Sequence, residues 1–236
     1  VRLPVNSKEA ASLLSLRRGV FAKSKIQKGE SLTLDKVFFA FPPKEGQFTA
    51  NDWSKYYSFH ATVDINVNEA ISPDNSSKID SREKIWEIVK KVRKILKESN
   101  VVIPGSAELE ISHHYGLDKF YEFGLTMLTV VNRDYCKKLL VSLPGQKHPE
   151  QYHNKKEETF HVLYGNVEIE LNGINQTCKP GDVITIEPKT RHAFVSLDGS
   201  VVEEISSTHF LDDSYYTDTN IAANKNRKTV LTYWMG

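Results

Sequence analysis

The sequence predicts a mainly β protein built from a small β-rich domain, a connector helix and a β-barrel domain. Two observations support this fold class. Short runs rich in Val, Ile, Phe and Thr recur along most of the chain, with Gly, Pro, Asn and Asp between them, as in proteins made of short strands and turns. Only one stretch has the longer periodicity of an amphipathic helix. At 236 residues, the chain is long enough for one or two domains with real cores.

The first predicted domain covers residues 1–75. Its β-type runs, RRGVFAKSKIQKGESLTLDKVFFAFPP and FHATVDINVNEAI, are short and interrupted. Gly29 lies in the turn-like sequence QKGE, and the pair Pro42 and Pro43 ends the next run, because proline cannot donate to a sheet ladder. We expect a small, irregular β-rich domain.

Residues 76–102 are expected to form a linker and an amphipathic helix. After the polar stretch SPDNSSK, Asp80 stands three positions before Glu83, the spacing of a capping box. One face of the expected helix is apolar and the opposite face is basic, and the basic face raises nucleic-acid binding as an alternative function. Solvent exposure is favoured, since runs of surface charge are common and the net charge is only +1. The apolar stripe consists of Ile85, Ile88, Val89, Val92, Ile95 and Leu96.

The third segment, residues 103–236, reads as strands at short, even spacing. Runs such as ELEISHH, LTMLTVV, CKKLLVSL, VEIELNG and SVVEEISS alternate with turns and have few helical interruptions. This pattern is typical of a sandwich or barrel.

The overall composition excludes several protein classes. The near-neutral charge offers no global attraction to nucleic acid or anionic membrane. No apolar run is long enough to span a bilayer, and the start does not resemble a signal peptide. Cys136 and Cys178 lie far apart and outside any CxxC pattern, which suits a reducing cytoplasm. The chain begins with Val1, so we expect a processed form or a piece of a longer protein.

The stretch HPEQYHNKKEETFHVLYG, residues 148–165, concentrates metal-ligand residue types. Gln151 and His153 are two apart and share a strand face, and Glu158 can join them from the next strand. His192, behind the turn EPKTR, supplies another imidazole. These four residues suit a divalent metal such as Zn, Mn, Fe or Ni. His148 is an alternative ligand, although its spacing from His153 requires a bulge.

This stretch resembles the first cupin motif, in which His-x-His is followed by four residues, Glu, six residues and Gly. Here Gln151 replaces the first histidine, while Glu158 and Gly165 are in place. The stretch GDVITIEPKTRHAF resembles the second cupin motif, with Lys189 where that motif has glycine. The resemblance implies a β-barrel of the double-stranded β-helix type. A degenerate cupin that holds water or a sugar without metal is the alternative.

Among cupins, the chain looks most like metal-dependent sugar isomerases of the D-lyxose isomerase kind, which interconvert an aldose and a ketose. In such enzymes a carboxylate moves a proton between neighbouring carbons. Glu203 and Glu204 alternate faces, and Glu204 is the preferred base, with Asp218 as a possible partner. Lys155, Lys156 or Arg191 would meet an anionic sugar group. Four histidines are expected to be structural: His113, His114, His161 and His209.

The sequences LRRGVFAKSKIQKGESLTLDKV and HATVDINVNEAI resemble the SAF, or antifreeze-like, domain of bacterial N-acetylneuraminate (sialic acid) synthases. Gly19 stands where that domain usually has serine. The resemblance implies that Arg18, or Arg17, binds an amino sugar, for which the forked guanidinium is suited.

These resemblances predict the carboxy-terminal part of a synthase-like protein in surface polysaccharide biosynthesis. Its SAF domain would cap the barrel of a partner subunit, which implies a homodimer. The TIM-barrel synthase domain, of roughly 250 residues in such folds, would precede Val1. The cupin would bind a divalent metal and a monosaccharide, as an isomerase or epimerase. The rival hypothesis is a non-enzymatic cupin that senses sugar or mediates dimerisation.

Overall fold

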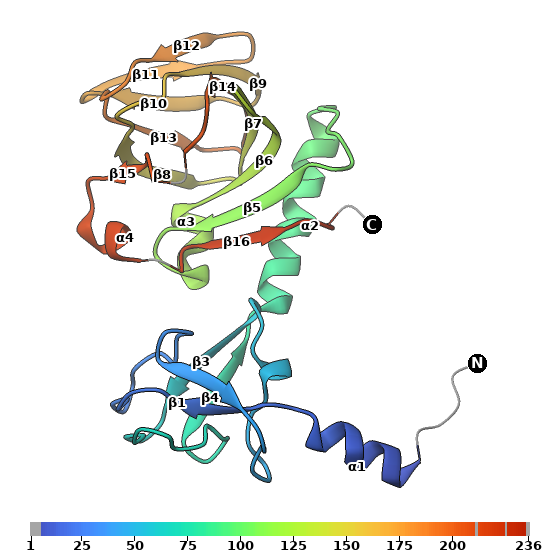
Figure 1. Cartoon of the computed structure of the whole chain (residues 1–236). Helices are drawn as coiled ribbons and strands as arrows, with labels where there is room; N and C mark the ends of the chain where they lie inside the picture. The colour runs from blue at the N-terminus through green and yellow to red at the C-terminus, as the bar shows by residue number, and fades with distance from the viewer. Residues whose placement is uncertain (1–5, 211, 225, 235–236) are drawn as a thin grey trace. The chain divides into compact units, whose positions relative to one another are not determined.

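The computed structural model describes residues 6–210, 212–224 and 226–234. The chain divides into two compact units, residues 1–85 and 86–236, and each is described by itself (Figure 1). None of the helices in the described ranges is both long and apolar enough to cross a membrane. Strands dominate both units, so the predicted mainly β fold is confirmed.

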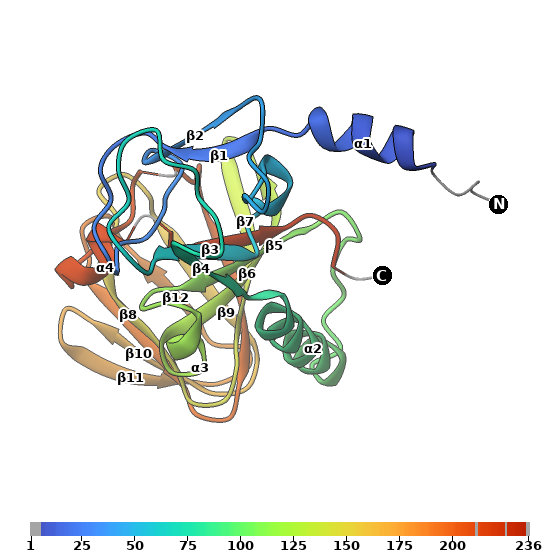
Figure 2. The ribbon, with the colours of Figure 1, turned by 90° about the horizontal axis from the view of Figure 1, so that it is seen from below.

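The first unit is built on two hairpins. Strand β1 (Gly19–Ala22) pairs with β2 (Val37–Ala40), and β3 (Tyr57–Ala61) pairs with β4 (Ser76–Asp80), both antiparallel. Strand β4 lies in the segment expected to be linker. Helix α1 (Ser7–Ser15) runs away from the hairpins (Figure 2), and η1 (Ala50–Asp52) is a single 3₁₀ turn.

One turn is repeated in the two halves of this unit, which the sequence analysis missed. The backbone N–H of Gln27 donates to the Glu30 carboxylate, and that of Asn66 donates to the Glu69 carboxylate. Both turns use a left-handed residue, Gly29 and Asn68, two residue types that tolerate positive φ. The core between the turns comprises Val20, Ala22, Ile26, Leu32, Val37, Phe59, Ala61, Ile65 and Ile71.

Helix α2 (Arg82–Glu98) begins at the end of the first unit, and most of it belongs to the second. The Asp80 carboxylate accepts the backbone N–H of Arg82 and so satisfies a free donor at the helix start. The six positions of the expected apolar stripe are all buried.

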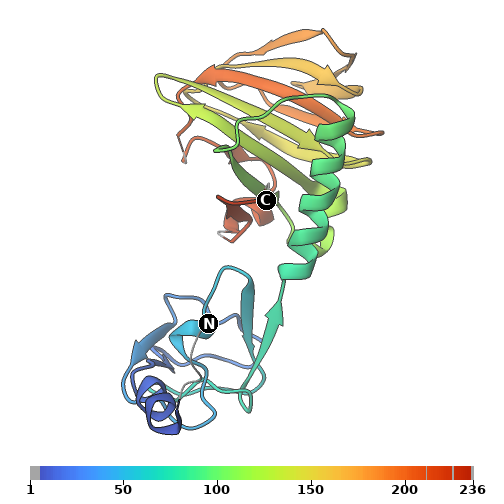
Figure 3. The same ribbon diagram turned by 90° about the vertical axis from the view of Figure 1, so that its right-hand side faces the viewer.

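The second unit is a sandwich of two antiparallel sheets (Figure 3). The seven-stranded sheet has the order β12-β9-β14-β7-β6-β5-β16, and the five-stranded sheet has the order β11-β10-β13-β8-β15. The strands of the first sheet are β5 (Glu108–His113), β6 (Gly124–Asn132), β7 (Tyr135–Ser142), β9 (Glu158–Tyr164), β12 (Val183–Ile186), β14 (Ser200–Ser207) and β16 (Lys228–Leu231). Those of the second are β8 (Gln146–Tyr152), β10 (Val167–Leu171), β11 (Ile174–Cys178), β13 (His192–Ser196) and β15 (Tyr215–Tyr216). Short helical turns complete the unit: η2 (Leu117–Lys119), α3 (Phe120–Phe123) and α4 (Thr219–Ala223).

The sandwich has an apolar end and a polar end. Between the sheets lie Leu125, Leu140, Phe160, Val162, Val167, Ile169, Cys178, Ile186, Phe194 and Val202. Cys178 is therefore a small core residue and, like the buried Cys136, a free thiol. Beside this apolar core, several inward-facing positions are polar or charged, and they form the candidate site.

Candidate metal site and sugar pocket

Three side chains of the cupin-like motifs converge inside the sandwich. His153 directly follows β8, Glu158 begins β9 and His192 begins β13. The Nε2 atoms of His153 and His192 each lie 3.4 Å from Oε2 of Glu158, and the three possible ligand atoms all lie within 4.8 Å of one another. All three residues are buried. The structure thus brings together three of the four expected metal ligands.

Hydrogen bonds to the backbone orient both imidazoles. Nδ1 of His153 faces the carbonyl oxygen of Asp213, and Nδ1 of His192 lies 3.1 Å from the carbonyl oxygen of Thr190. Since only an N–H can donate to a carbonyl, each Nδ1 carries the proton and each Nε2 presents a lone pair to Glu158. Asp213 is itself fixed, because its carboxylate accepts the backbone N–H groups of residues 154–156.

The donor set fits a divalent metal ion. Nε2 of His153 and Oε2 of Glu158 are buried and have no hydrogen-bond partner among the described residues. Two lone pairs and a carboxylate oxygen that face one another out of water repel unless a cation lies between them. Two imidazoles and one carboxylate are a common protein ligand set for Zn and other divalent metals. The site is therefore a candidate metal centre whose metal identity is open.

A buried lysine neutralises the carboxylates of this site. Nζ of Lys156 contacts Oε1 of Glu158 and lies 3.0 Å from Oε1 of Glu204. Burial acts to lower the pKa of Lys156, but the two carboxylates outweigh it and raise that pKa above its usual range. Burial acts to raise the pKa of Glu158, but the charge of the Lys156 ammonium opposes this, and the pKa stays well below its ordinary value. The pair is therefore ionised at neutral pH.

Gln151 lies at the edge of the ligand cluster, with its side-chain amide 3.4 Å from Nε2 of His192. A register shift explains how it gets there. His192 pairs with Gln151 and Phe194 with His148, so the two residues of β8 between these pairs lie opposite one residue of β13, as in a β-bulge. Both His148 and Gln151 consequently line the pocket. His148 stacks on Phe194 instead of joining the ligand atoms.

The two departures from the cupin motifs are accommodated differently. Lys189 adopts the left-handed conformation, with φ of 69°, that a glycine would adopt more easily. Its backbone N–H donates to the carbonyl oxygen of His153, so the turn before His192 is retained. Gln151 keeps a position beside the ligands but offers only a neutral amide.

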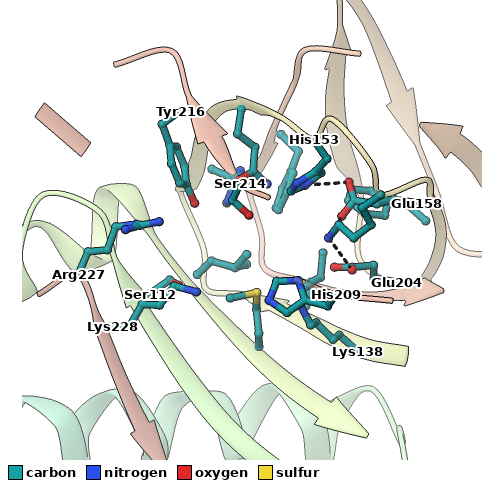
Figure 4. A pocket seen from close by; sticks show the side chains of 18 residues that line it. Ser112, Lys138, His153, Glu158, Glu204, His209, Ser214, Tyr216, Arg227 and Lys228 are labelled. Carbon is teal, nitrogen blue, oxygen red and sulfur yellow. Dashed lines mark hydrogen bonds and ion pairs between the residues drawn. The ribbon is translucent and has the colours of Figure 1, made fainter. Parts of the chain in front are cut away.

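His153 and Glu158 of the ligand cluster line a pocket that opens to solvent (Figure 4). Side chains two apart along β6, β7 and β9 point into it, as strand geometry requires. Its apolar lining consists of Leu125, Met127, Leu140, Phe160 and Phe194, and its polar lining includes Ser112, Lys138, Glu204, His209, Ser214, Tyr216, Arg227 and Lys228. This mixed apolar and polar lining suits a small polar molecule.

Of the two candidate bases, Glu204 faces the pocket. It is 3% exposed, and Ser206 Oγ also donates to its Oε1. Glu203 points to the opposite face, where it pairs with Lys137 and His161.

Asp218 does not lie in the pocket lining, contrary to its expected role as a partner of the base. Its carboxylate caps α4 by accepting the N–H of Asn220, and it accepts the hydroxyl of Tyr115. That bond raises the pKa of Tyr115 to about 12.

Two of the residues expected to meet an anionic sugar group also lie outside the lining. The ammonium of Lys155 lies over the ring of Phe210, and Arg191 is exposed, 4.0 Å from Glu150. Lys156 alone of the three lines the pocket. Arg17 and Arg18 belong to the other unit, where both are exposed before β1.

The sequence analysis missed several lining residues. Lys138 was read only as part of a strand, although it lies two positions before Leu140 and therefore shares a strand face with that apolar residue. His209 was expected to be structural, yet it lines the pocket. Arg227 and Lys228 carry no sequence signal of this kind, because only the pairing of β16 with β5 brings them to the site.

The fold and the ligand cluster define a cupin domain, and the profile of the cupin domain family matches residues 139–204. The chain is 34% identical over 171 residues to a D-lyxose/D-mannose isomerase of Thermosediminibacter oceani, covering 59% of this chain and 94% of that protein. It is 29% identical over 171 residues to a D-lyxose ketol-isomerase of Thermofilum sp., covering 60% of this chain and 95% of that protein. The crystal structure of Geodermatophilus obscurus L-ribose isomerase has the same fold, with a TM-score of 0.52 at 15% identity, over 62% of this chain and 96% of that one.

This chain therefore belongs to the family of the D-lyxose/D-mannose isomerase from Thermosediminibacter oceani.

Proposed function

We propose that the cupin unit is a metal-dependent isomerase that interconverts an aldose and a ketose. The observation that carries the proposal is the convergence of His153, Glu158 and His192 beside a second buried carboxylate, Glu204, in one pocket. The names of the two curated relatives support the reaction class. A divalent metal held by the three ligands would polarise the carbonyl and hydroxyl oxygens of the sugar.

Glu204 would act as the general base. Its carboxylate takes the proton from C2 of the aldose and returns a proton to C1, while the proton of the C2 hydroxyl passes to the C1 oxygen, so that C2 becomes the carbonyl of the ketose and the carboxylate ends the cycle ionised. Return of the proton to C2 from the opposite face would give an epimer instead. The Lys156 ammonium lies 3.0 Å from Oε1 of Glu204 and pairs with this carboxylate.

Lys156 has a positioning role and is not a proton acceptor in this proposal. The two flanking carboxylates raise its pKa, so the ammonium keeps its protons at neutral pH. It therefore fixes the separation of Glu158 and Glu204, and so aligns the ligand cluster with the base.

The reaction is tested by NMR. The purified chain is stripped of metal, reloaded with Mn²⁺, Zn²⁺, Fe²⁺ or Ni²⁺, and incubated with ¹³C-labelled pentoses, hexoses and N-acetylhexosamines. Interconversion of an aldose with its ketose, lost in His153→Ala together with the bound metal, supports the proposal. Stoichiometric metal without conversion of any aldose refutes it.

A non-enzymatic, sugar-sensing cupin is the second candidate, and one contact favours it. The Lys156 ammonium already contacts Glu158, so it can partly neutralise the ligand cluster without a metal. This candidate predicts substoichiometric metal after reconstitution, together with sugar binding that His153→Ala leaves unchanged.

For the first unit, we propose the SAF role of a nonulosonate synthase in surface polysaccharide biosynthesis. Arg18 or Arg17 would hold an amino sugar in the barrel of a partner subunit of a homodimer, and the exposure of both side chains is compatible with that. In a longer protein that contains the barrel, Arg18→Ala should raise the KM for N-acetylmannosamine, whereas Lys23→Ala should not. Equal KM values for all three proteins would refute this role.

A further inference from the structure

A second polar cluster lies in the pocket besides the metal ligands. We call Lys138, Arg227 and Lys228 the basic cluster; Ser112 and His209 lie next to it (Figure 4). Its members come from β7, from β16 and from the residue just before β16. In the registers of the sheet, Ser112 pairs with Lys228 and Glu204 pairs with Lys138. The basic cluster is therefore fixed to the same sheet as the base Glu204.

Lys138 is a buried cation without a bonded partner. The residue is 4% exposed, and among the described residues its ammonium makes no hydrogen bond or ion pair. Burial lowers the pKa of Lys138, and the charge of Glu204 opposes that shift. A buried ammonium without hydrogen bonds is costly, so a ligand in the pocket that accepts hydrogen bonds would stabilise it.

Arg227 and Lys228 are only partly satisfied. Nε of Arg227 is buried and has no hydrogen-bond partner among the described residues, while Nη1 reaches the carbonyl oxygen of Asn224 at 3.4 Å. Lys228 pairs with Glu110 at 2.9 Å, and its side chain is 32% exposed. Both residues thus keep donors available to a molecule in the pocket.

The charges of the pocket do not balance. Its lining carries four cations, Lys138, Lys156, Arg227 and Lys228, against the carboxylates of Glu158 and Glu204. Glu110 neutralises one cation from outside the lining. The excess of one positive charge would rise to three with a divalent metal bound. Lys138, Lys156, Glu158 and Glu204 are all buried, so water screens these four charges only weakly.

We propose that the substrate is a monosaccharide with an anionic group, a phosphate ester or a carboxylate, which Lys138, Arg227 and Lys228 bind. The reacting end of the sugar would then lie at the metal ligands and Glu204. This inference rests on the proposed isomerase function and specifies its substrate class. It replaces Lys155 and Arg191, which the sequence suggested for this role and which lie outside the lining.

The test compares matched sugars by calorimetric titration of the Mn²⁺-loaded chain. The probes are D-mannose, D-mannose 6-phosphate and D-mannuronate, with inorganic phosphate as a competitor. We expect at least one of the two anionic sugars to bind about tenfold or more tightly than D-mannose, since one charged hydrogen bond in a buried site contributes that much. Lys138→Met should remove the preference for the anionic sugar over D-mannose. Lys147→Met, an exposed lysine on β8, is the matched control and should keep it.

Preference for the phosphate or for the carboxylate identifies which anion the cluster takes. Equal affinity for neutral and anionic sugars overturns the inference, as does a preference that survives Lys138→Met. If Lys138→Met does not fold, the half-exposed Lys228→Met serves instead, with an expected loss of several-fold. Because binding is the measured quantity, anion preference without isomerisation would refute the proposed function alone, whereas isomerisation without anion preference would refute only this inference.

Discussion

The two faces of the seven-stranded sheet carry similar side chains with different consequences. On the outer face, Glu203 pairs with Lys137 at 2.6 Å and with His161 at 3.2 Å. On the inner face, Glu204 pairs with Lys156, and Lys138 lies opposite it in the register. Each face thus combines glutamate, lysine and histidine. Water screens the outer set, so it contributes little free energy, whereas the inner set is buried and can alter ionisation and bind ligands.

The same comparison separates two consecutive residues. Glu203 and Glu204 differ in position by one residue, and the pleat of β14 sends one carboxylate outward and the other into the pocket. Burial, rather than residue type, therefore makes one glutamate a candidate base and its neighbour a surface ion pair.

The largest expected effect comes from exchanging each glutamate for its amide. Glu204→Gln keeps the size of the side chain but removes the proton acceptor, so kcat should fall by about 10²- to 10⁴-fold. Glu203→Gln should change kcat by less than about twofold, because its partners lie outside the pocket. Both are measured by NMR rates of aldose–ketose conversion. Equal losses in the two variants would contradict the assignment of Glu204 as base.

A smaller effect, on metal affinity, is expected at Gln151, which lies at the edge of the ligand cluster. Gln151→His supplies a stronger ligand beside His192 and should tighten metal binding, whereas Gln151→Ala should weaken it by about tenfold. Tyr152→Phe is the control, since Tyr152 stacks on Tyr215 away from the ligand cluster. Metal titration with a competing chelator measures these affinities. Unchanged affinity in both Gln151 variants would exclude the amide as a ligand.

Acid should lower the free energy of unfolding of the chain through its buried histidines. Burial lowers the pKa of His114 to about 4 and that of His209 to about 3, whereas the unfolded chain binds those protons near pH 6.5. The unfolded state therefore gains protons first, and the free energy of unfolding should fall as the pH decreases from about 6.5 towards 4.

Urea unfolding of the metal-free chain between pH 4 and pH 7 measures that slope. His114→Gln should flatten it, although the variant is less stable because it disturbs the bonds to Phe123 and Tyr216. A slope that is identical in the wild-type chain and in His114→Gln would contradict the role given to burial.

The smallest effects are expected at two residues that the sequence suggested and the structure places outside the pocket lining. Arg191→Ala and Asp218→Asn should each change kcat by less than about twofold, as is usual for surface substitutions. A loss of tenfold or more in either variant would return that residue to the mechanism.

Part of the site could be predicted from sequence, because the information is local. His153, Glu158 and His192 follow from motif spacing and strand parity, and alternation along β14 predicts that only one of Glu203 and Glu204 faces inward. Gln151 was expected beside His153, but the bulge that also turns His148 inward depends on the pairing of β8 with β13, which no local pattern specifies.

The remainder depends on contacts between distant segments. Lys228 reaches Ser112 only through the pairing of β16 with β5, and Lys138 faces Glu204 only through the pairing of β7 with β14. Charged residues near strand ends look alike in the sequence, so Arg191 and Lys155 could not be distinguished from Lys138 before the sheet was assembled. Likewise, Asp218 became a helix cap because α4 starts beside it.

Anomalous diffraction from crystals grown with Mn²⁺ tests the metal centre most directly. The account predicts one strong peak about 2.0–2.3 Å from Nε2 of His153, Nε2 of His192 and Oε2 of Glu158, and its loss in His192→Ala crystals. A peak-free site, in which the Lys156 ammonium alone balances Glu158, would contradict it.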